Sequence, residues 1–273
     1  MIQDILQELE QIKSDMKAAI SNKGVEPTGG LTTYADAIRN IPYSIEYFDF
    51  SPIGYDSADN EKSNVCITTQ IEYSKSLYDK YNGVLSGDIN SLFAFDFFLK
   101  YCPKFDTSNV TDMTDVFLCN YNLLMVPELD TSNVTNMAGL FLMCESLKYL
   151  PELDTSNVTN MMSMFEECST LESIPLLDAR GLSDASTMFR HCLALTDMGG
   201  LKNLGMNSSL DTDGMFTDCD NLTHDSIMNI INNLYDRAAA GYSLVNLPLG
   251  ETNLGKISAG EKAIATKKGW ILR

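Results

Sequence analysis

The stretch Asp106-Thr-Ser-Asn-Val-Thr-Asp-Met113 returns almost unchanged as Asp130-Thr-Ser-Asn-Val-Thr-Asn-Met137 and again as Asp154-Thr-Ser-Asn-Val-Thr-Asn-Met161. A more divergent copy begins at Asp178, so the period is 24 residues. A fixed period of this size is the sequence signature of stacked repeats. Three sets of apolar residues share the period: Phe117, Phe141, Phe165 and Phe189; Leu123, Leu147, Leu171 and Leu195; and Leu129, Leu153, Leu177 and Leu201.

Each repeat contains signals for a strand, a turn and a short helix. The spacing Leu171-x-x-Ile174-Pro-x-Leu177 predicts a short strand with inward apolar side chains, and Asp154-Thr-Ser-Asn157 has the side chains of a turn. Apolar residues then follow at helical spacing and predict a helix of one to two turns: Val158, Met161, Met162 and Phe165. One such unit cannot bury its apolar face alone, so the sequence predicts an α/β solenoid with a parallel strand ladder.

The aspartates that open each copy allow two interpretations. A column of stacked carboxylates suits a cation, whereas the Asp-Thr-Ser unit favours a side chain that accepts N–H bonds within its own turn. We favour the turn, and by the same argument the recurring Asn-Val-Thr sequences are structural although they match the glycosylation pattern.

Cysteines follow the period as well. Cys144, Cys168, Cys192 and Cys219 each lie three residues after a phenylalanine, and Cys119 lies two after one. The total is seven, and the close Cys-x-x-Cys pairs typical of zinc sites are absent from the sequence. The pattern favours a ladder of small core side chains over a metal site or disulfides.

The repeat unit Leu-x-x-Leu-Pro-x-Leu-Asp-Thr-Ser-Asn-Val-Thr-Asn-Met-x-x-Met-Phe-x-x-Cys-x-x-Leu resembles the BspA-type leucine-rich repeat of bacterial surface proteins. The resemblance covers residues 82–225 and is most specific between Asp106 and Leu201. It implies a leucine-rich-repeat solenoid that serves adhesion without catalysis. It assigns no particular binding residue.

Composition limits the partners of the chain. The 273 residues carry a net charge of −18, which argues against nucleic acid and against anionic membranes. Apolar runs are too short for a spanning helix, and the acidic N-terminus does not read as a secretory signal. No cofactor motif, phosphate loop or catalytic triad is present, and two histidines are few for acid–base chemistry, so we expect no enzyme.

Residues 1–22 predict a heptad helix that associates with copies of itself, most readily as a homo-trimer. Apolar residues at the a and d positions carry this prediction: Ile2, Ile5, Leu9, Ile12 and Met16. The alternative is an amphipathic helix packed on its own chain.

Residues 23–43 form a Gly- and Pro-rich linker followed by a short Tyr-Ala-x-x-Ile helix. The order of these N-terminal elements is similar to the start of many phage tail and fibre proteins. That resemblance implies a virion protein made in the host cytoplasm, with other virion proteins among its partners.

Three further segments complete the predicted organisation. Residues 44–81 have strand character and predict a small β-rich collar. Residues 82–105 are a degenerate first repeat, whose aromatic side chains, Phe95 and Phe97 among them, are expected to close the core against the collar. Residues 226–273 predict a C-terminal cap, with Trp270 packed over the last repeat.

The sequence supports two main functional interpretations and a third, weaker one. The first is a phage fibre, spike or decoration protein whose solenoid contacts a host surface protein or glycan. The second is a bacterial surface adhesin module, and the third is a purely structural virion spacer. The expected contact residues lie on the strand side and in the insertion after Leu201, although the same residues fit a solvated acidic face: Glu128, Tyr149, Glu152, Asn203 and Asn207.

Overall fold

The structure is a computed structural model that describes residues 79–97, 99–100, 102–148 and 150–273. The chain divides into two compact units, Met1–Leu77 and Tyr78–Arg273, and the second is considered by itself. The predicted heptad helix, the linker and nearly all of the predicted collar therefore lie outside the described residues.

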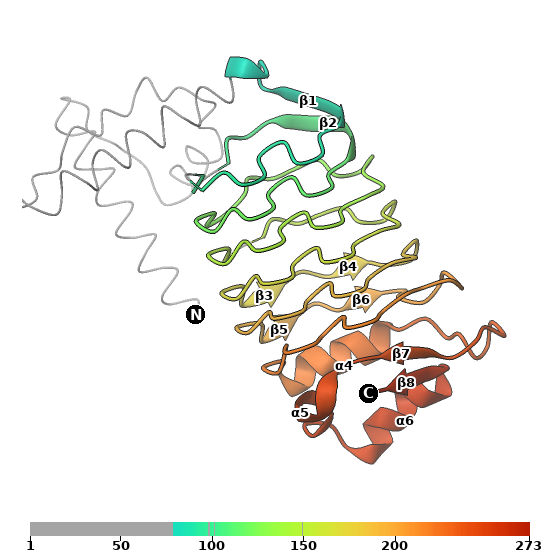
Figure 1. Cartoon of the computed structure of the whole chain (residues 1–273). Helices are drawn as coiled ribbons and strands as arrows, with labels where there is room; N and C mark the ends of the chain where they lie inside the picture. Colours follow the sequence, from blue (N-terminus) through green and yellow to red (C-terminus); the bar gives the residue numbers. More distant parts are fainter. Residues whose placement is uncertain (1–78, 98, 101, 149) are drawn as a thin grey trace, which may run out of the picture. The chain divides into compact units, whose positions relative to one another are not determined.

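All four sheets of the described residues are two-stranded and parallel: β1 with β2, β3 with β5, β4 with β6, and β7 with β8. Successive turns of chain lie one above another, and the helices between residues 224 and 267 lie at the C-terminal end (Figure 1). The elements are β1 (Val84–Asp88), β2 (Asp106–Asp112), β3 (Ser173–Ile174), β4 (Leu177–Asp178), β5 (Asp197–Met198), β6 (Leu201–Lys202), α4 (His224–Asn233), β7 (Val245–Leu247), α5 (Gly250–Leu254), α6 (Ala259–Lys267) and β8 (Trp270–Leu272).

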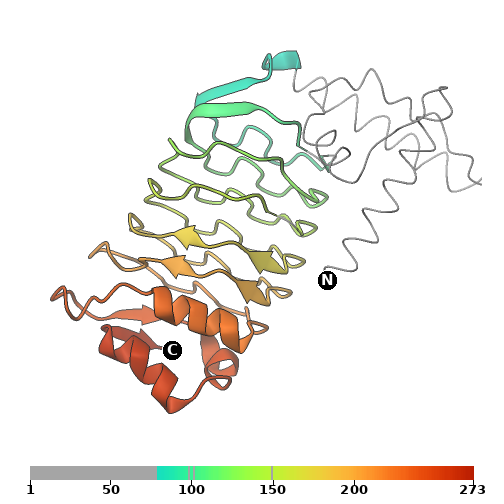
Figure 2. The same cartoon turned by 180° about the vertical axis from the view of Figure 1, so that it is seen from behind.

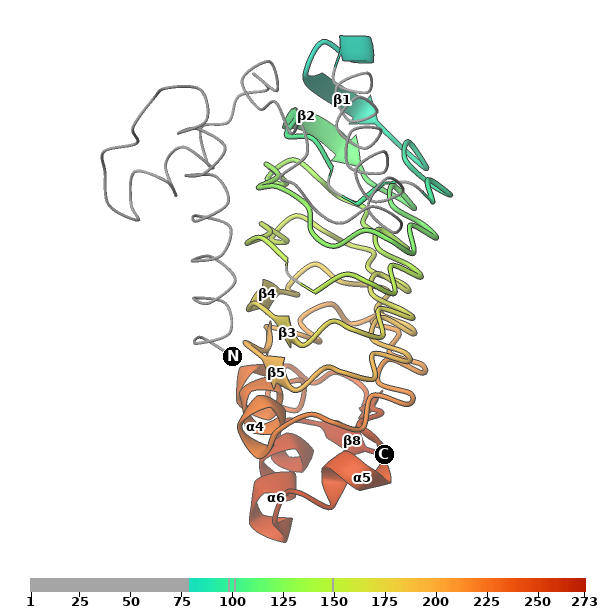
Figure 3. The same cartoon turned by 90° about the vertical axis from the view of Figure 1, so that its left-hand side faces the viewer.

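One sequence period makes one turn of this stack. Ser173 pairs with Asp197 and Leu177 with Leu201, each 24 residues further along the chain. At another position of the repeat, single parallel bridges continue the pairing of Asp88 with Asp112 through successive turns, at Asp112, Asn136, Asn160, Asp184 and Asp211. Figure 3 shows the short strands β3, β4 and β5 along one side of the stack.

A column of phenylalanine rings runs through the core. Ring centroids are 5.1 to 5.8 Å apart at every step, and the rings are stacked: Phe93, Phe117, Phe141, Phe165, Phe189 and Phe216. All six rings are buried. Each such pair contributes about 0.5–1.5 kcal/mol beyond the burial of apolar area, so the periodic phenylalanine is a main stabilising feature.

The six cysteines among the described residues are buried and free, as the sequence predicted for the core ladder. The Sγ atoms of Cys144, Cys168 and Cys192 each lie 3.1 Å from the carbonyl oxygen of the phenylalanine 27 residues earlier. Burial raises the pKa of these thiols well above its ordinary value, which leaves them unreactive.

The prediction of a short helix within each repeat is wrong. Residues 137–144 form consecutive tight turns, in which the N–H groups of Leu140, Leu142 and Cys144 bond to carbonyls three residues earlier. The alternate N–H groups leave the turn and bond to carbonyls of the next repeat, as Met137 does to Asn160 and Phe141 to Met164. A helix would use every one of these donors internally, so bonding between repeats replaces it.

Two columns of left-handed backbone make this pattern possible. One contains Ser91, Asp115, Gly139, Ser163, Thr187 and Gly214; the other contains Phe95, Cys119, Met143, Glu167, His191 and Asp218. Their φ angles lie between 51° and 64°. Only two of these twelve positions are glycine, so the sequence gives little sign of a conformation that glycine normally marks.

The turn prediction for the opening aspartates is confirmed. Asp106, Asp130 and Asp154 each accept the N–H of the residue two positions on, at 3.0 to 3.1 Å. In the first copy this segment is nevertheless part of strand β2, because β1 offers it a parallel partner. Asn133 and Asn157 donate to serine carbonyls of the preceding repeat, at 2.8 and 2.7 Å, which is a structural role.

The C-terminal segment covers the last turns of the stack. Helix α4 contacts β5 and β6 and lies across the stack in Figure 2. Helix α6 begins after Ser258, which forms a reciprocal capping box with Glu261. Trp270 is buried and donates its ring N–H to the carbonyl of Tyr235, so the packing role predicted for it is confirmed.

Candidate functional site

The strand-side contact residues predicted from the sequence are Glu128, Tyr149 and Glu152, and the structure describes the two glutamates. Glu128 and Glu152 are exposed and separated by one period. Glu128 lies 3.9 Å from Lys104, in a solvated ion pair of the kind that contributes little to stability. Tyr149 lies outside the described residues.

Hydrogen bonds from a buried arginine hold the insertion after Leu201. Arg237 is fully buried and donates to the carbonyls of Gly205, Asn207 and Ser208 at 2.7, 2.9 and 3.2 Å. Asn207 uses its amide to reach the carbonyl of Gly181, 3.3 Å away. The backbone N–H of Asn203 donates to Asn233. No hydrogen bond or ion pair in the described residues joins this loop to the two glutamates.

The predicted oligomerisation residues Ile2, Ile5, Leu9, Ile12 and Met16 all lie outside the described residues. Their role therefore stays a prediction.

An exposed group of large apolar side chains gathers near the N-terminal end of the stack. Phe95, Phe97, Tyr121 and Met143 make up what we call the aromatic edge. Phe95 is 59% exposed, Phe97 is 49% exposed and Tyr121 is 37% exposed. The rings of Phe97 and Tyr121 are stacked at 5.6 Å and nearly parallel, one repeat apart. Exposed large apolar side chains that lie together are a candidate interaction site.

The aromatic edge corrects the expectation that Phe95 and Phe97 close the core. Phe95 has left-handed backbone, and its N–H bonds to Leu118 of the next repeat. Its side chain is exposed while the ring of Phe93, two residues earlier, fills the core. The overlooked signal was a departure from the repeat: one period after Tyr121 stands Glu145, and two periods after Met143 stands His191.

Acidic groups border the aromatic edge. Glu145 is exposed on the next turn after Tyr121. A hydrogen bond with the Cys119 thiol is the main cause that raises the pKa of Tyr121, and the charge of Glu145 adds to it. Glu145 therefore places a negative charge beside Tyr121.

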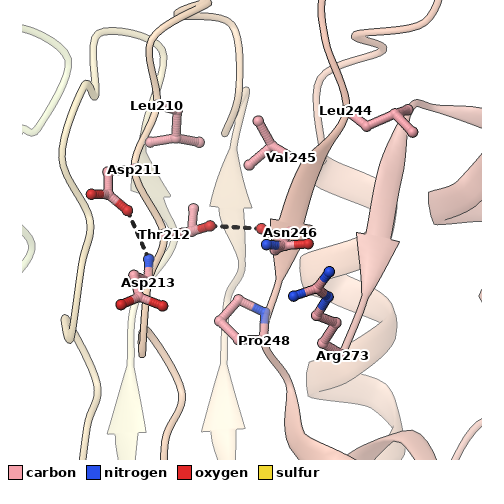
Figure 4. Close-up of a pocket in the computed structure, with 9 residues that line it drawn as sticks. All are labelled: Leu210, Asp211, Thr212, Asp213, Leu244, Val245, Asn246, Pro248 and Arg273. Carbon is pink, nitrogen blue, oxygen red and sulfur yellow. Dashed lines mark hydrogen bonds between the residues drawn. The ribbon is translucent and has the colours of Figure 1, made fainter.

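A second feature lies where the stack meets its C-terminal cover. We call it the end cleft; its volume is about 280 Å³ (Figure 4). One wall comes from the last repeat, and the other comes from β7, its flanking residues and Arg273. The lining residues are Leu210, Asp211, Thr212, Asp213, Leu244, Val245, Asn246, Pro248 and Arg273.

The histidines of the chain are engaged with carboxylates. His191 lies between Glu167 and Asp218, with N–O distances of 2.5 and 2.9 Å, and its hydrogen bond to the Glu167 carboxylate is the main cause that raises its pKa. His224 contacts Asp225 and Glu261, and the N–H of Ser258 does most to lower the pKa of Glu261, to about 2. Among the described residues no cluster of His, Cys, Asp and Glu is placed to hold a metal ion.

The repeating turns define a class: a repeat protein built from stacked 24-residue turns. The family described as Mycoplasma protein of unknown function, DUF285, matches residues 87–197 and 119–230, which together exceed half of the chain. The chain belongs to this family, a repeat family related to BspA-like surface proteins. Neither the curated proteins nor the solved structures contain a match.

This membership agrees with the resemblance of the repeats and lends no support to the phage resemblance of residues 1–42. In the part of the chain that the structure describes, no helix is long and apolar enough to cross a membrane.

Proposed function

We propose that this protein is a non-enzymatic surface-type repeat protein, in which a leucine-rich-repeat solenoid presents the aromatic edge to a partner protein. The observation that carries the proposal is the contrast between two stacks of rings. The column from Phe93 to Phe216 is buried, whereas Phe97 and Tyr121 repeat the same stacking in the open. Exposed rings gain nothing for the core, so their stacking serves a contact.

The composition of the aromatic edge fits a protein partner. Tyrosine, phenylalanine and methionine are enriched at the centres of protein interfaces, and such residues carry most of the binding energy. The acidic border and the net charge of −18 favour a partner with an apolar anchor and a basic rim.

Beads coated with the full chain, incubated with cultured animal cells, test this proposal. The variant Phe95→Ser/Phe97→Ser/Tyr121→Ser is expected to lose most adhesion and to keep its circular dichroism spectrum. The variant Leu193→Ser removes an equally exposed apolar side chain at a distance from the edge and serves as the matched control. Adhesion of the triple variant equal to that of the control would contradict the proposal.

The same assay separates the aromatic edge from the strand side. Glu128→Ala/Glu152→Ala is expected to leave adhesion unchanged if the edge is the contact. Loss of adhesion in this variant alone would move the contact to the strand side predicted from the sequence.

The virion interpretation rests on residues 1–42 and is kept as a second candidate because their heptad pattern predicts a trimer. Light scattering on the full chain and on a chain beginning at Gly24 tests it. A trimer that becomes a monomer on truncation supports a fibre or spike assembled through the first helix. A monomer in both samples contradicts it.

A further inference from the structure

We propose that the end cleft binds a small dipolar ligand of the free-dipeptide class, with its ammonium group on Asp211 and Asp213 and its carboxylate on Arg273. The inference is independent of the aromatic edge and of any adhesive role. It rests on where the hydrogen-bond ladder stops, on how the charges of the cleft are placed, and on its apolar lining.

The end cleft exists because the ladder opens after the last repeat. In the preceding turn the N–H groups of Ala185 and Thr187 bond to Asp211 and Asp213. The corresponding donors of the last repeat, on Thr212 and Gly214, have no acceptor among the described residues. The next chain segment, β7, approaches only at one level, where the hydroxyl of Thr212 donates to the carbonyl of Asn246 at 2.6 Å.

Opposite charges lie on the two walls of the end cleft and form no ion pair among the described residues. Figure 4 shows the two aspartates on one wall and Arg273 on the other. One carboxylate oxygen of Asp211 accepts a hydrogen bond from the N–H of Asp213, at 2.9 Å, and the other oxygen has no partner in the described residues. Within the same part of the chain, Asp213 and Arg273 make no ion pair. A molecule that carries both an ammonium and a carboxylate group satisfies both walls together.

The size and lining of the cleft narrow the class of ligand. A volume of about 280 Å³ lies at the small end of ligand pockets, below the size that a drug-like molecule needs. Leu210, Leu244, Val245 and Pro248 supply apolar surface beside the charges. A dipeptide with an aliphatic side chain matches this combination.

Calorimetric titration of the full chain with alanyl-leucine tests the proposal. The comparison ligands are N-acetyl-alanyl-leucine, which lacks the cation, and alanyl-leucinamide, which lacks the anion. We expect the unmodified dipeptide to bind and each analogue to bind about tenfold more weakly or worse, since each loses one charge-assisted contact.

Substitutions in the cleft preserve the fold by design. Asp211→Asn keeps the turn, because Asn136 and Asn160 already make the same bond in the same column. We expect the affinity for alanyl-leucine to fall about tenfold in Asp211→Asn/Asp213→Asn and in Arg273→Gln. The control Glu128→Gln on the strand side should leave that affinity unchanged.

The variant Asp211→Asn/Asp213→Asn should bind N-acetyl-alanyl-leucine as tightly as it binds alanyl-leucine. Likewise, Arg273→Gln should bind alanyl-leucinamide as tightly as it binds alanyl-leucine. No heat with alanyl-leucine at about a hundred times the protein concentration overturns the proposal, as does binding of either analogue as tightly as alanyl-leucine itself. Equal loss in the Glu128→Gln control overturns it as well.

Discussion

Replacing Phe165 by alanine is expected to destabilise the stack more than any single exposed substitution. The ring lies in the middle of the buried column, 5.8 Å from Phe141 and 5.7 Å from Phe189. Truncation of a buried phenylalanine costs about 3–5 kcal/mol, and the loss of two ring contacts places this site in the upper half of that range. Net stabilities are about 5–15 kcal/mol, so the change removes roughly a third of the total or more.

Urea unfolding followed by two probes measures the effect. Far-ultraviolet circular dichroism reports on all turns, whereas the fluorescence of Trp270, the single tryptophan, reports on the C-terminal end. Each turn contacts only its neighbours, so the loss at Phe165 is expected to uncouple the turns on either side of it. The two unfolding curves should coincide in the wild type and separate in the variant.

The control is Phe97→Ala, which removes a ring that is stacked but half exposed. Its expected cost is about 1 kcal/mol or less, since little burial is lost. Equal costs for Phe97→Ala and Phe165→Ala would refute the view that the buried column stabilises the stack.

Three further predictions concern single side chains. The pKa of His191 is raised in the folded state, so its stabilising effect is complete below the unfolded pKa and is lost as pH rises through the folded one; His191→Gln should therefore lower the melting temperature at pH 5 and leave it unchanged at pH 9. Arg237→Met leaves four carbonyls without their buried donor and should cost about 3 kcal/mol in urea unfolding, with new proteolytic cleavage at 205–209. Ser258→Ala removes the capping box and should cost about 1 kcal/mol; an unchanged unfolding midpoint would contradict that role.

The columns of the core were predictable from the sequence because every one of them follows the period. The 24-residue period alone places Phe141, Phe165 and Cys168, because residues one period apart are neighbours in the stack. The turn at Asp154 was predictable for a different reason, because its side-chain chemistry is local. The capping box at Ser258 is local in the same way.

The helix within the repeat was mispredicted because its apolar spacing suits two structures. Val158, Met161 and Phe165 are buried, as a helix would have them, but Met162 is exposed. The left-handed residues that separate the two structures, such as Ser163 and Glu167, carry side chains that give no hint of their backbone.

The end cleft was beyond the reach of the sequence. Its two walls are formed by Thr212 and Asn246, which are 34 residues apart, after the period has already been lost. No repeat position predicts where the segment from Leu244 to Pro248 leaves the ladder. The aromatic edge, in contrast, was visible as a run of non-consensus aromatics and was assigned to the wrong side of the backbone.

The direction of the hydrogen bonds between repeats gives the turn segments an electrical polarity. At Met137, Gly139, Phe141 and Met143 each N–H points towards the following repeat, and the same holds one period later. Peptide dipoles aligned in this way add, as they do along a helix. The positive pole of the summed dipole lies at the last turn, beside Gly214, and the negative pole lies at the first. The N–H groups of Thr135, Thr159 and Ser183 point the other way, towards the preceding repeat, so this polarity belongs to the turn segments alone. It favours anionic groups beside the turns of the last repeat and cationic groups beside those of the first.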